Sequence, residues 1–288
     1  MKRKFSLITI HYGRKSHLRN LISGLLSSSV HPDELIIISI NDSFDTTEMR
    51  IPFIVNNYRL KCNPSEGLPL SKARNLGAMK AIYDDLIFLD VDCVPSKYFI
   101  EKIKLQSALY DGLIMGNPRY LIKSLPDYFD EYYLMLNSIH HPHRPEIDFI
   151  EQISGYEMFW SLCFYIHKKQ YQLWEGFDER YKGYGAEDTD FALKAKDSNC
   201  PFYVSDATVY HQPHQFHRPP LNHFSSIVHN SNLFFEKWNK WPMENYLADF
   251  KNMKLIEWQS HSDREIYIRK YPSKKALQGS LVINEPFA

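Results

Sequence analysis

The sequence predicts an α/β protein with three layers, in which helices flank a mixed, mostly parallel sheet. Apolar runs of strand length alternate with stretches of helical periodicity between residues 5 and 90, which is typical of strands joined by crossover helices. Polar residues directly follow three of these runs, and sheets of this kind bind ligands where their parallel strands end. The chain has 288 residues and is 44% hydrophobic, which is sufficient for a sizeable core.

The first elements are predicted from apolar spacing. Four runs are expected to be strands, at residues 5–10, 35–40, 51–55 and 86–89. A helix is expected after the first strand, because one face carries apolar residues at helical spacing, namely Leu18, Leu21, Ile22, Leu25 and Leu26. A second helix is expected to extend from Ser71, as its N-cap, to Tyr83.

The later part of the chain has a less regular pattern. Residues 111–170 are interpreted as loops that cover the sheet, with a strand near 160–167. Further along, we expect a short helix at 188–196, strands at 202–204 and 208–210, and a helix from 221 to 238.

Composition excludes some classes of function. Lys+Arg and Asp+Glu are both 34, so the chain has no net charge to attract nucleic acid, and no nucleic-acid partner is expected. No cysteine pair has CxxC spacing, which fits a reduced, cytoplasmic protein without a zinc knuckle. No apolar run reaches the roughly 18 residues that span a bilayer. The aromatic stretch near Trp238 could contact the inner face of a membrane, but packing on the sheet is the commoner role of such a helix.

Two acidic motifs carry the candidate chemistry. Asp90 and Asp92 follow a predicted strand and could share a divalent cation with a diphosphate, because hard oxygen ligands suit Mg²⁺ or Mn²⁺. A short acidic motif also arises by chance, and a solvated turn is the alternative. The second motif, residues 183–190, places three acids after a Gly-Tyr-Gly segment. Acids at a helix start are favoured by its dipole, but a carboxylate there could also accept a proton from a hydroxyl.

A histidine at the end of a late strand could complete a metal site that the carboxylates begin. Two residues qualify, His211 and His214, and His211 is preferred because it directly follows the apolar strand. A single histidine is more often structural, and this chain has 13. The metal interpretation therefore depends on the separate segments meeting in the fold.

Taken together, these motifs resemble the inverting glycosyltransferases of family two, which have a GT-A fold. Within that family the resemblance is to the chondroitin-polymerase and β-1,4-galactosyltransferase type. It covers about residues 5–240 and is carried by segments 14–18, 71–77, 86–92, 176–179, 183–191 and 209–212. It implies a GT-A domain over residues 1–240, with a donor half at about 1–110 and an acceptor half at about 111–240. Residues 241–288 would be a C-terminal extension packed on the same domain.

The resemblance implies a metal-dependent reaction that needs Mn²⁺ or Mg²⁺. A hexose or N-acetylhexosamine would move from a UDP-sugar to a glycan hydroxyl with inversion. Asp188 would be the general base, and Glu187 would bind acceptor hydroxyls. Asp92 and His211 would ligate the metal.

The remaining implied roles concern the donor and the acceptor sugar. Arg14 and Asp42 would contact the uridine, and Arg74 would lie near the donor sugar or the diphosphate. Asp90 would lie near the ribose or the metal, and Tyr184 would stack on a sugar ring. Tyr184 departs from the tryptophan of many relatives, and Gly155 to Trp160 replaces a small-residue pattern, which bears on sugar specificity.

Two other functions remain as alternatives. One is a catalytically inactive GT-A-fold module that binds glycan or nucleotide. The other is a sugar nucleotidyltransferase, which the single glycine after the first strand, Gly13, disfavours, since such enzymes need a glycine-rich phosphate loop there.

Overall fold

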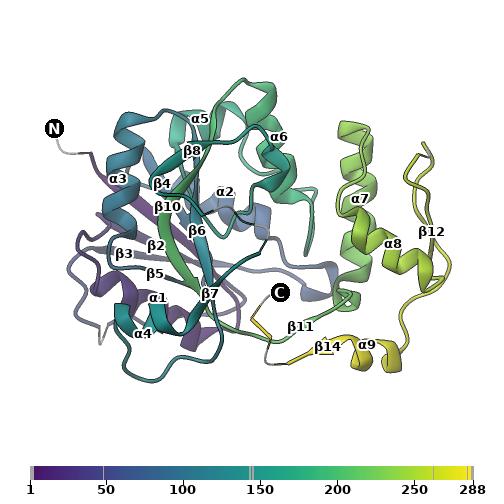
Figure 1. Ribbon diagram of the computed structural model, residues 1–288, viewed down its shortest axis with the longest axis horizontal. Coiled ribbons are helices and arrows are strands. Elements are labelled where there is room, and N and C mark those ends of the chain that lie inside the picture. The colour runs from purple at the N-terminus through teal and green to yellow at the C-terminus, as the bar shows by residue number, and fades with distance from the viewer. Residues whose placement is uncertain are drawn as a thin grey trace.

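The computed structural model describes residues 3–47, 49–142, 144, 146–261, 263–283 and 285–286. Its centre is a ten-stranded sheet whose main path runs β3-β2-β1-β4-β9-β6-β10-β5, while β7 pairs with β6 and β8 with β10 (Figure 1). Its strands are β1 (Phe5–His11), β2 (Glu34–Ile40), β3 (Ile54–Leu60), β4 (Asp85–Leu89), β5 (Cys93–Pro95), β6 (Leu113–Leu121), β7 (Ser138–His140), β8 (Ile150–Gln152), β9 (Cys163–His167) and β10 (Phe202–His211).

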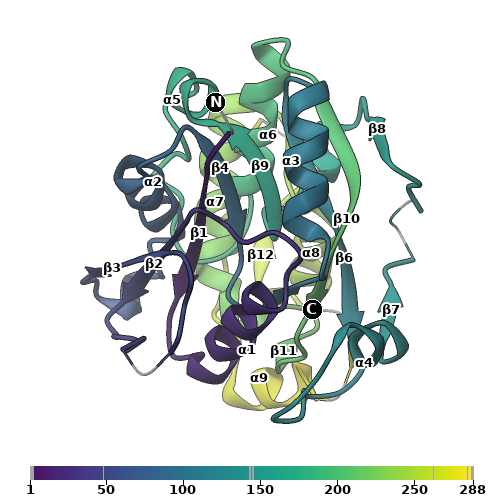
Figure 2. The ribbon, with the colours of Figure 1, turned by 90° about the vertical axis from the view of Figure 1, so that its left-hand side faces the viewer.

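Helices lie on both faces of this sheet (Figure 2). The helices of the described chain are α1 (Lys15–Leu26), α2 (Leu70–Lys80), α3 (Phe99–Leu109), α4 (Glu131–Leu136), α5 (Lys168–Leu173), α6 (Glu187–Asp197), α7 (Phe224–Trp238), α8 (Glu244–Asn252) and α9 (Lys274–Ser280), of which the last three lie beside the sheet. Three short 3₁₀ helices are η1 (Pro64–Glu66), η2 (Tyr156–Met158) and η3 (Leu221–His223). Two small ribbons pair β11 (Phe216–His217) with β14 (Leu281–Val282) and β12 (Ile256–Glu257) with β13 (Tyr267–Ile268).

The predicted fold class is confirmed. Strands β3, β2, β1 and β4 are parallel to one another, and β6 is parallel to β10. Strand β9 runs antiparallel between β4 and β6, and the short strands β5, β7 and β8 pair antiparallel with β10, β6 and β10. Side chains along β1 alternate between two cores, with Leu7 facing the α1 and α3 side and Ile8 facing the α2 and α6 side. This alternation is what a strand buried on both faces requires.

The start of α2 differs from the prediction. The helix begins at Leu70 with Pro69 as its N-cap, so Ser71 lies inside the first turn and is buried without capping. Proline has no N–H to satisfy, which suits a helix start. The helix also ends at Lys80 and not at Tyr83. The third strand is Ile54–Leu60 and not 51–55. Its polar residues hid the pattern, because β3 is an edge strand and alternates polar with apolar residues.

The segment interpreted as loops, residues 111–170, contains the nine-residue strand β6. Its Pro118 obscures the strand pattern, since proline cannot donate to a ladder. Within β6, pairing to β9 ends at Met115 and pairing to β7 begins at Arg119, so Pro118 falls between the two neighbours on that side. The two strands predicted at 202–204 and 208–210 are one strand, β10, whose register against β6 shifts between Val204 and Thr208.

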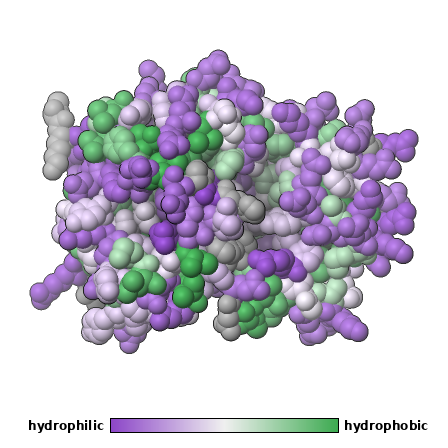
Figure 3. Space-filling model, in the orientation of Figure 1, coloured by the Kyte–Doolittle hydropathy of each residue, from purple (hydrophilic) through white to green (hydrophobic). Residues whose placement is uncertain are grey.

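The C-terminal helices form a further core beside the sheet, at the right of Figure 1. Phe224, Trp241 and Phe250 are buried together there. A smaller cluster joins Phe234 of α7 to Leu193 of α6. Hydrophilic residues cover much of this C-terminal part on the face seen in Figure 3. We keep the division at residue 240, with 241–288 as an extension, as a proposal.

Among the described residues, no helix combines the length and the apolar composition required to cross a bilayer.

Candidate active site

The first part of the site is a cluster of Asp92, His211 and His214. The turn after β4 is closed by a hydrogen bond from the Cys93 N–H to the Asp90 carbonyl at 2.9 Å. Strand β5 then pairs antiparallel with β10, with Cys93 opposite His211. This register places Asp92 beside the end of β10, a juxtaposition that no local pattern contains.

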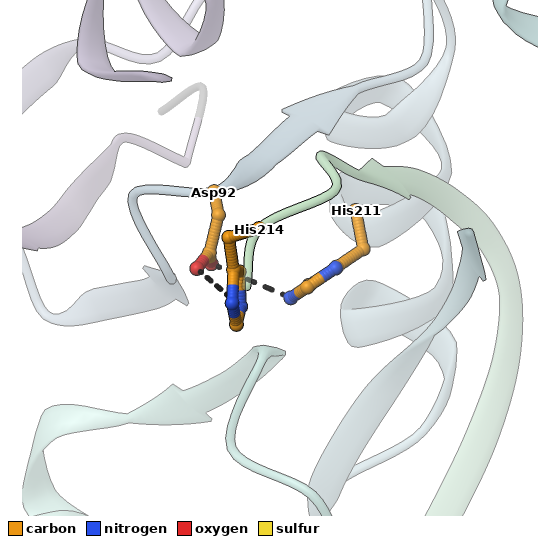
Figure 4. A group of neighbouring side chains, drawn as sticks. All are labelled: Asp92, His211 and His214. Atoms are coloured by element: carbon orange, nitrogen blue, oxygen red, sulfur yellow. Dashed lines mark ion pairs between the residues drawn. The ribbon is translucent and has the colours of Figure 1, made fainter. Parts of the chain in front are cut away.

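The three side chains point toward one another (Figure 4). The Asp92 Oδ1 atom lies 3.7 Å from His211 Nε2, and Oδ2 lies 3.6 Å from His214 Nε2. One possible ligand atom from each residue lies within 4.8 Å of the others. Arg14 forms an ion pair with the same carboxylate. The structure thus brings both candidate histidines to Asp92, where the sequence favoured His211 alone.

The protonation states of this cluster fit a metal ion. Burial opposes ionisation of Asp92, but His211, Arg14 and His214 together hold the pKa of its carboxyl below the ordinary value. Burial lowers the pKa of His211 to about 4, so its imidazole is neutral. An ionised carboxylate and a neutral imidazole are the forms that ligate metals.

A buried arginine connects this cluster to the acids that begin α6. Arg74 of α2 is 4% exposed. Its NH2 lies 3.6 Å from Asp90 Oδ1, and its NH1 lies 3.6 Å from Glu187 Oε1. Arg74 therefore holds the strand-end acid and the helix-start acid on either side of one guanidinium.

Residues 182–188, which lead into α6 and are called the acid loop here, include backbone with positive φ, a conformation that favours glycine. Gly183, Gly185 and Ala186 have φ of +67°, +105° and +71°. A Cβ on Gly67 would lie 2.9 Å from the Gly183 nitrogen, so the two loops approach too closely for a side chain there. The Gly-Tyr-Gly segment therefore turns the chain so that Glu187 and Asp188 enter the site.

Crowding raises the pKa values of three carboxyls. Burial, with Asp188 adding to it, raises the pKa of Glu187 to about 7. Burial also raises the pKa of Asp188, although Arg74 opposes the shift. Desolvation raises the pKa of Asp90 to about 7, with Asp92 and Asp188 adding to the effect. A raised carboxyl pKa beside a cavity is typical of groups that exchange protons.

Helix α7 fastens the acid loop through Asn230, which sequence reasoning missed. The Asn230 side-chain nitrogen donates to the carbonyls of Lys182 at 3.0 Å, Tyr184 at 3.2 Å and Gly185 at 2.9 Å. Its oxygen accepts from the Lys182 N–H at 3.1 Å. Asn230 is fully buried, and the only available signal was an amide on the apolar face of a predicted helix.

A second attachment holds α6 itself. Asp190 is fully buried and accepts from Trp238 Nε1 at 2.8 Å, while Lys237 Nζ lies 2.6 Å from it. Both partners belong to the last turn of α7. The two attachments together make α7 the support for Glu187 and Asp188.

The other predicted residues lie farther along the rim. Asp42, after β2, pairs with Lys15 Nζ at 3.1 Å and lies 3.6 Å from His11 Nε2. Neither contact joins it to the Asp92 cluster. Tyr184 is 40% exposed, and one face of its ring stacks on His223 with a centroid distance of 4.9 Å.

A cavity of about 640 Å³ opens beside the acids. Its wall combines Glu187 and Asp188 with Trp160, Tyr184 and, from the turn between α7 and α8, Trp241. The C-terminal part of the chain therefore supplies one part of the cavity wall, and the acid loop supplies another.

The family model described as "Glycosyltransferase like family 2" matches residues 17–226, more than half of the chain. The chain belongs to this family. As a member of glycosyltransferase like family 2, the protein is an enzyme, and the family predicted from the motifs is confirmed.

Individual relatives share part of this chain. Poly-β-1,6-N-acetyl-D-glucosamine synthases of Staphylococcus aureus, in strains COL and MSSA476, are 29% identical over 117 residues, which is 39% of this chain and 28% of theirs. The chain thus aligns with less than a third of the length of these curated relatives.

Solved structures show the same fold at low identity. TarS residues 1–349 of S. aureus matches with a TM-score of 0.53 and 18% identity, over 79% of this chain and 64% of that one. The same protein with UDP gives a TM-score of 0.55 and 18% identity, over 88% and 72%. GalNAc-T7 with UDP, GalNAc and Mn²⁺ gives 0.53 and 14% identity, over 72% and 43%. These likenesses confirm the GT-A fold class.

Proposed function

We propose that the enzyme transfers a hexose or N-acetylhexosamine from a UDP-sugar to a glycan hydroxyl with inversion, in a metal-dependent reaction. The observation that carries the proposal is the bridge made by Arg74, which contacts Asp90 on the metal side and Glu187 on the acid side. A leaving group and an attacking hydroxyl need groups on opposite sides of one reacting carbon, and this arrangement supplies both.

The proposed metal ligands are Asp92, His211 and His214. Imidazole nitrogens are softer ligands than the oxygens Mg²⁺ prefers, so Mn²⁺ fits this donor set better. When bound, the ion would supply Lewis-acid stabilisation of the charge that grows on the departing diphosphate. Arg14, paired with Asp92, adds a cation on the same side.

Asp188 is the proposed general base. Its carboxylate would accept the proton of the acceptor hydroxyl as oxygen attacks the anomeric carbon opposite the leaving group, which inverts the configuration. Glu187 is held by the Gly185 N–H at 3.0 Å and by Arg74. Glu187 would therefore bind an acceptor hydroxyl without moving.

The donor side is proposed from the rim of the sheet. Asp42 with Arg14 would contact uridine, Asp90 the ribose or the metal, and Arg74 the diphosphate or the donor sugar. We favour an N-acetylhexosamine donor, because TarS has been solved with UDP-GlcNAc and the curated relatives are named as N-acetylglucosamine polymer synthases. The chondroitin-polymerase or galactosyltransferase subtype remains a prediction.

The test is release of UDP from a panel of UDP-sugars with Mn²⁺, with and without chelator. Release from one donor that stops on chelation supports the proposal. UDP-sugar binding with no release under any metal would instead favour the inactive binding module.

The rate of transfer is expected to rise with pH through the neutral range. The pKa of Glu187 is about 7 and that of Asp188 is raised, both because of burial. Carboxyls with raised pKa values hold their protons below neutral pH, and a protonated base cannot accept another, so activity should be lost on the acidic side. Initial rates from pH 5.5 to 8.5 at saturating Mn²⁺ check this. A profile that is flat from pH 5.5 upward would contradict it.

Replacing Asn230 with alanine is expected to destabilise the protein by about 2–4 kcal/mol, because one buried and two partly buried carbonyls lose their donor. Transfer should fall more than UDP affinity, since the loop that loses support carries Glu187 and Asp188. Thermal unfolding and paired rate and UDP-binding measurements check both effects. Asn222→Ala, at an exposed position of η3, is the matched control. Equal losses of rate and UDP affinity would argue against a loop-positioning role.

A further inference from the structure

We infer that the acceptor is an acidic glycan, whose negatively charged group binds Lys196 and Lys240 on the wall of the cavity that Asp188 also lines. This inference rests on the proposed transferase function and names the substrate class of the same site. The wall of the cavity of about 640 Å³ includes these two lysines together with three acids, Glu157, Glu187 and Asp188.

The spacing of charges gives the acceptor a direction. Lys196 follows Asp188 by eight residues on α6, and a helix rises about 1.5 Å per residue, so the two backbone positions lie about 12 Å apart along the axis. That span suits an oligosaccharide better than a single sugar. An acceptor would then place its attacking hydroxyl at Asp188 and a more distant acidic group at the lysines.

Both lysines are exposed and lack an ionic partner. Within the part of the chain that the structure describes, no carboxylate lies within 4.0 Å of either ammonium group. Two nearby lysines differ, since Lys194 of α6 and Lys237 of α7 both pair with Asp190, at 3.8 and 2.6 Å. The lysines on the cavity wall are thus the ones left free to meet a ligand.

Two buried groups in or next to this cavity also lack hydrogen-bond partners for some of their nitrogens. Trp241 lines it, is 8% exposed, and has an indole Nε1 without a hydrogen-bond partner. Arg144 does not line the cavity but contacts the lining residue Trp160, with its guanidinium 3.4 Å from the centre of that ring. Arg144 is 7% exposed, and neither its Nε nor its NH2 has a partner.

These groups favour an anion. An indole N–H can only donate, so it needs an oxygen acceptor. Burial lowers the pKa of Arg144 to about 10, which still leaves it charged at neutral pH. A buried cation without a counter-ion adds positive potential to the space beside it. The acids Glu187 and Asp188 would repel an anion, which therefore binds away from them.

The aromatic residues of the cavity wall would bind the uncharged sugar rings of the acceptor. Trp160, Tyr184 and Tyr246 line the cavity, and the faces of such rings stack on sugars. Arg144 covers one face of Trp160, and His223 covers one face of Tyr184. These contacts fix the positions of the Trp160 and Tyr184 rings before a glycan binds.

The experiment compares acidic and neutral probes by calorimetric binding in the presence of UDP and Mn²⁺. The probes are a uronic-acid tetrasaccharide, the same tetrasaccharide after carboxyl reduction, a polyol-phosphate oligomer, and its dephosphorylated form. At least one acidic probe is expected to bind about tenfold more tightly than its neutral form, and the preference should shrink with added salt. Tighter binding of the uronic-acid probe would identify a carboxylate as the recognised group, and tighter binding of the polyol-phosphate probe would identify a phosphate.

The double variant Lys196→Gln/Lys240→Gln should remove most of that preference and leave the binding of the neutral probes within twofold. The matched control is Lys274→Gln/Lys275→Gln, which removes the same charge from α9, and it should keep the preference. Equal binding of acidic and neutral probes to the wild type, or a preference that survives the first variant, overturns the inference. UDP release from the donor without acceptor tests the proposed function separately.

Discussion

Replacing Asp188 with asparagine is expected to lower the rate of transfer by about 10²- to 10⁴-fold, the usual loss when a general base is removed. Asparagine has nearly the same shape but cannot take a proton from the acceptor hydroxyl. Asp188 lies at the start of α6 and accepts the Thr189 N–H at 3.0 Å, a contact the amide oxygen can keep. The fold and the affinity for UDP should therefore change little.

Steady-state transfer and calorimetric UDP binding measure the two effects of Asp188→Asn separately. Asp197→Asn, at the exposed far end of the same helix, controls for loss of one negative charge on α6. A transfer rate within a few-fold of the wild type would mean that another group accepts the proton. In that case Glu187, whose pKa of about 7 also suits a base, would be the next residue to replace.

Removing a histidine from the Asp92 cluster is expected to have the second large effect. His211→Ala and His214→Ala should each weaken Mn²⁺ binding by on the order of 10²-fold or more, because loss of a ligand costs at least as much as loss of its supporting partners. Transfer at a fixed, low Mn²⁺ concentration should fall in parallel and partly recover when more Mn²⁺ is added.

Titration of Mn²⁺ followed by electron paramagnetic resonance measures this affinity directly. Exposed His261→Ala is the control and should bind Mn²⁺ as the wild type does. The His214 variant also decides between two ligand sets, since both imidazoles lie at similar distances from Asp92. Unchanged Mn²⁺ affinity in His214→Ala would leave His211 and Asp92 as the protein ligands.

Much of the N-terminal part of the sheet was predictable because its signals are local. Strands β1, β2 and β4 are mostly apolar and buried along their whole length, and the period of α1 places its leucines on one side. Local patterns did not predict elements whose structure depends on neighbouring strands. Pro118 fits inside β6 only because β9 has ended and β7 has not begun at that point.

In the site too, local motifs were predictable and contacts between distant segments were not. Acids at the end of β4 and at the start of α6 are visible as motifs, because a strand end and a glycine turn each need particular residues in a short window. Asn230 is not visible in this way, since its partners are backbone carbonyls nearly fifty residues earlier. A side chain that binds backbone leaves no residue pattern at the positions it holds.

By itself, the sequence determined the α/β layers, the family, and the residue types that could hold a metal and accept a proton, because each depends on spacing within one segment. Only the tertiary structure decided that His214 joins His211 at Asp92, that Arg74 lies between Asp90 and Glu187, and that α7 supports the acid loop. Those relations come from the pairing of β5 with β10 and from the packing of helices distant in sequence. Contacts of that kind depend on how the whole chain folds.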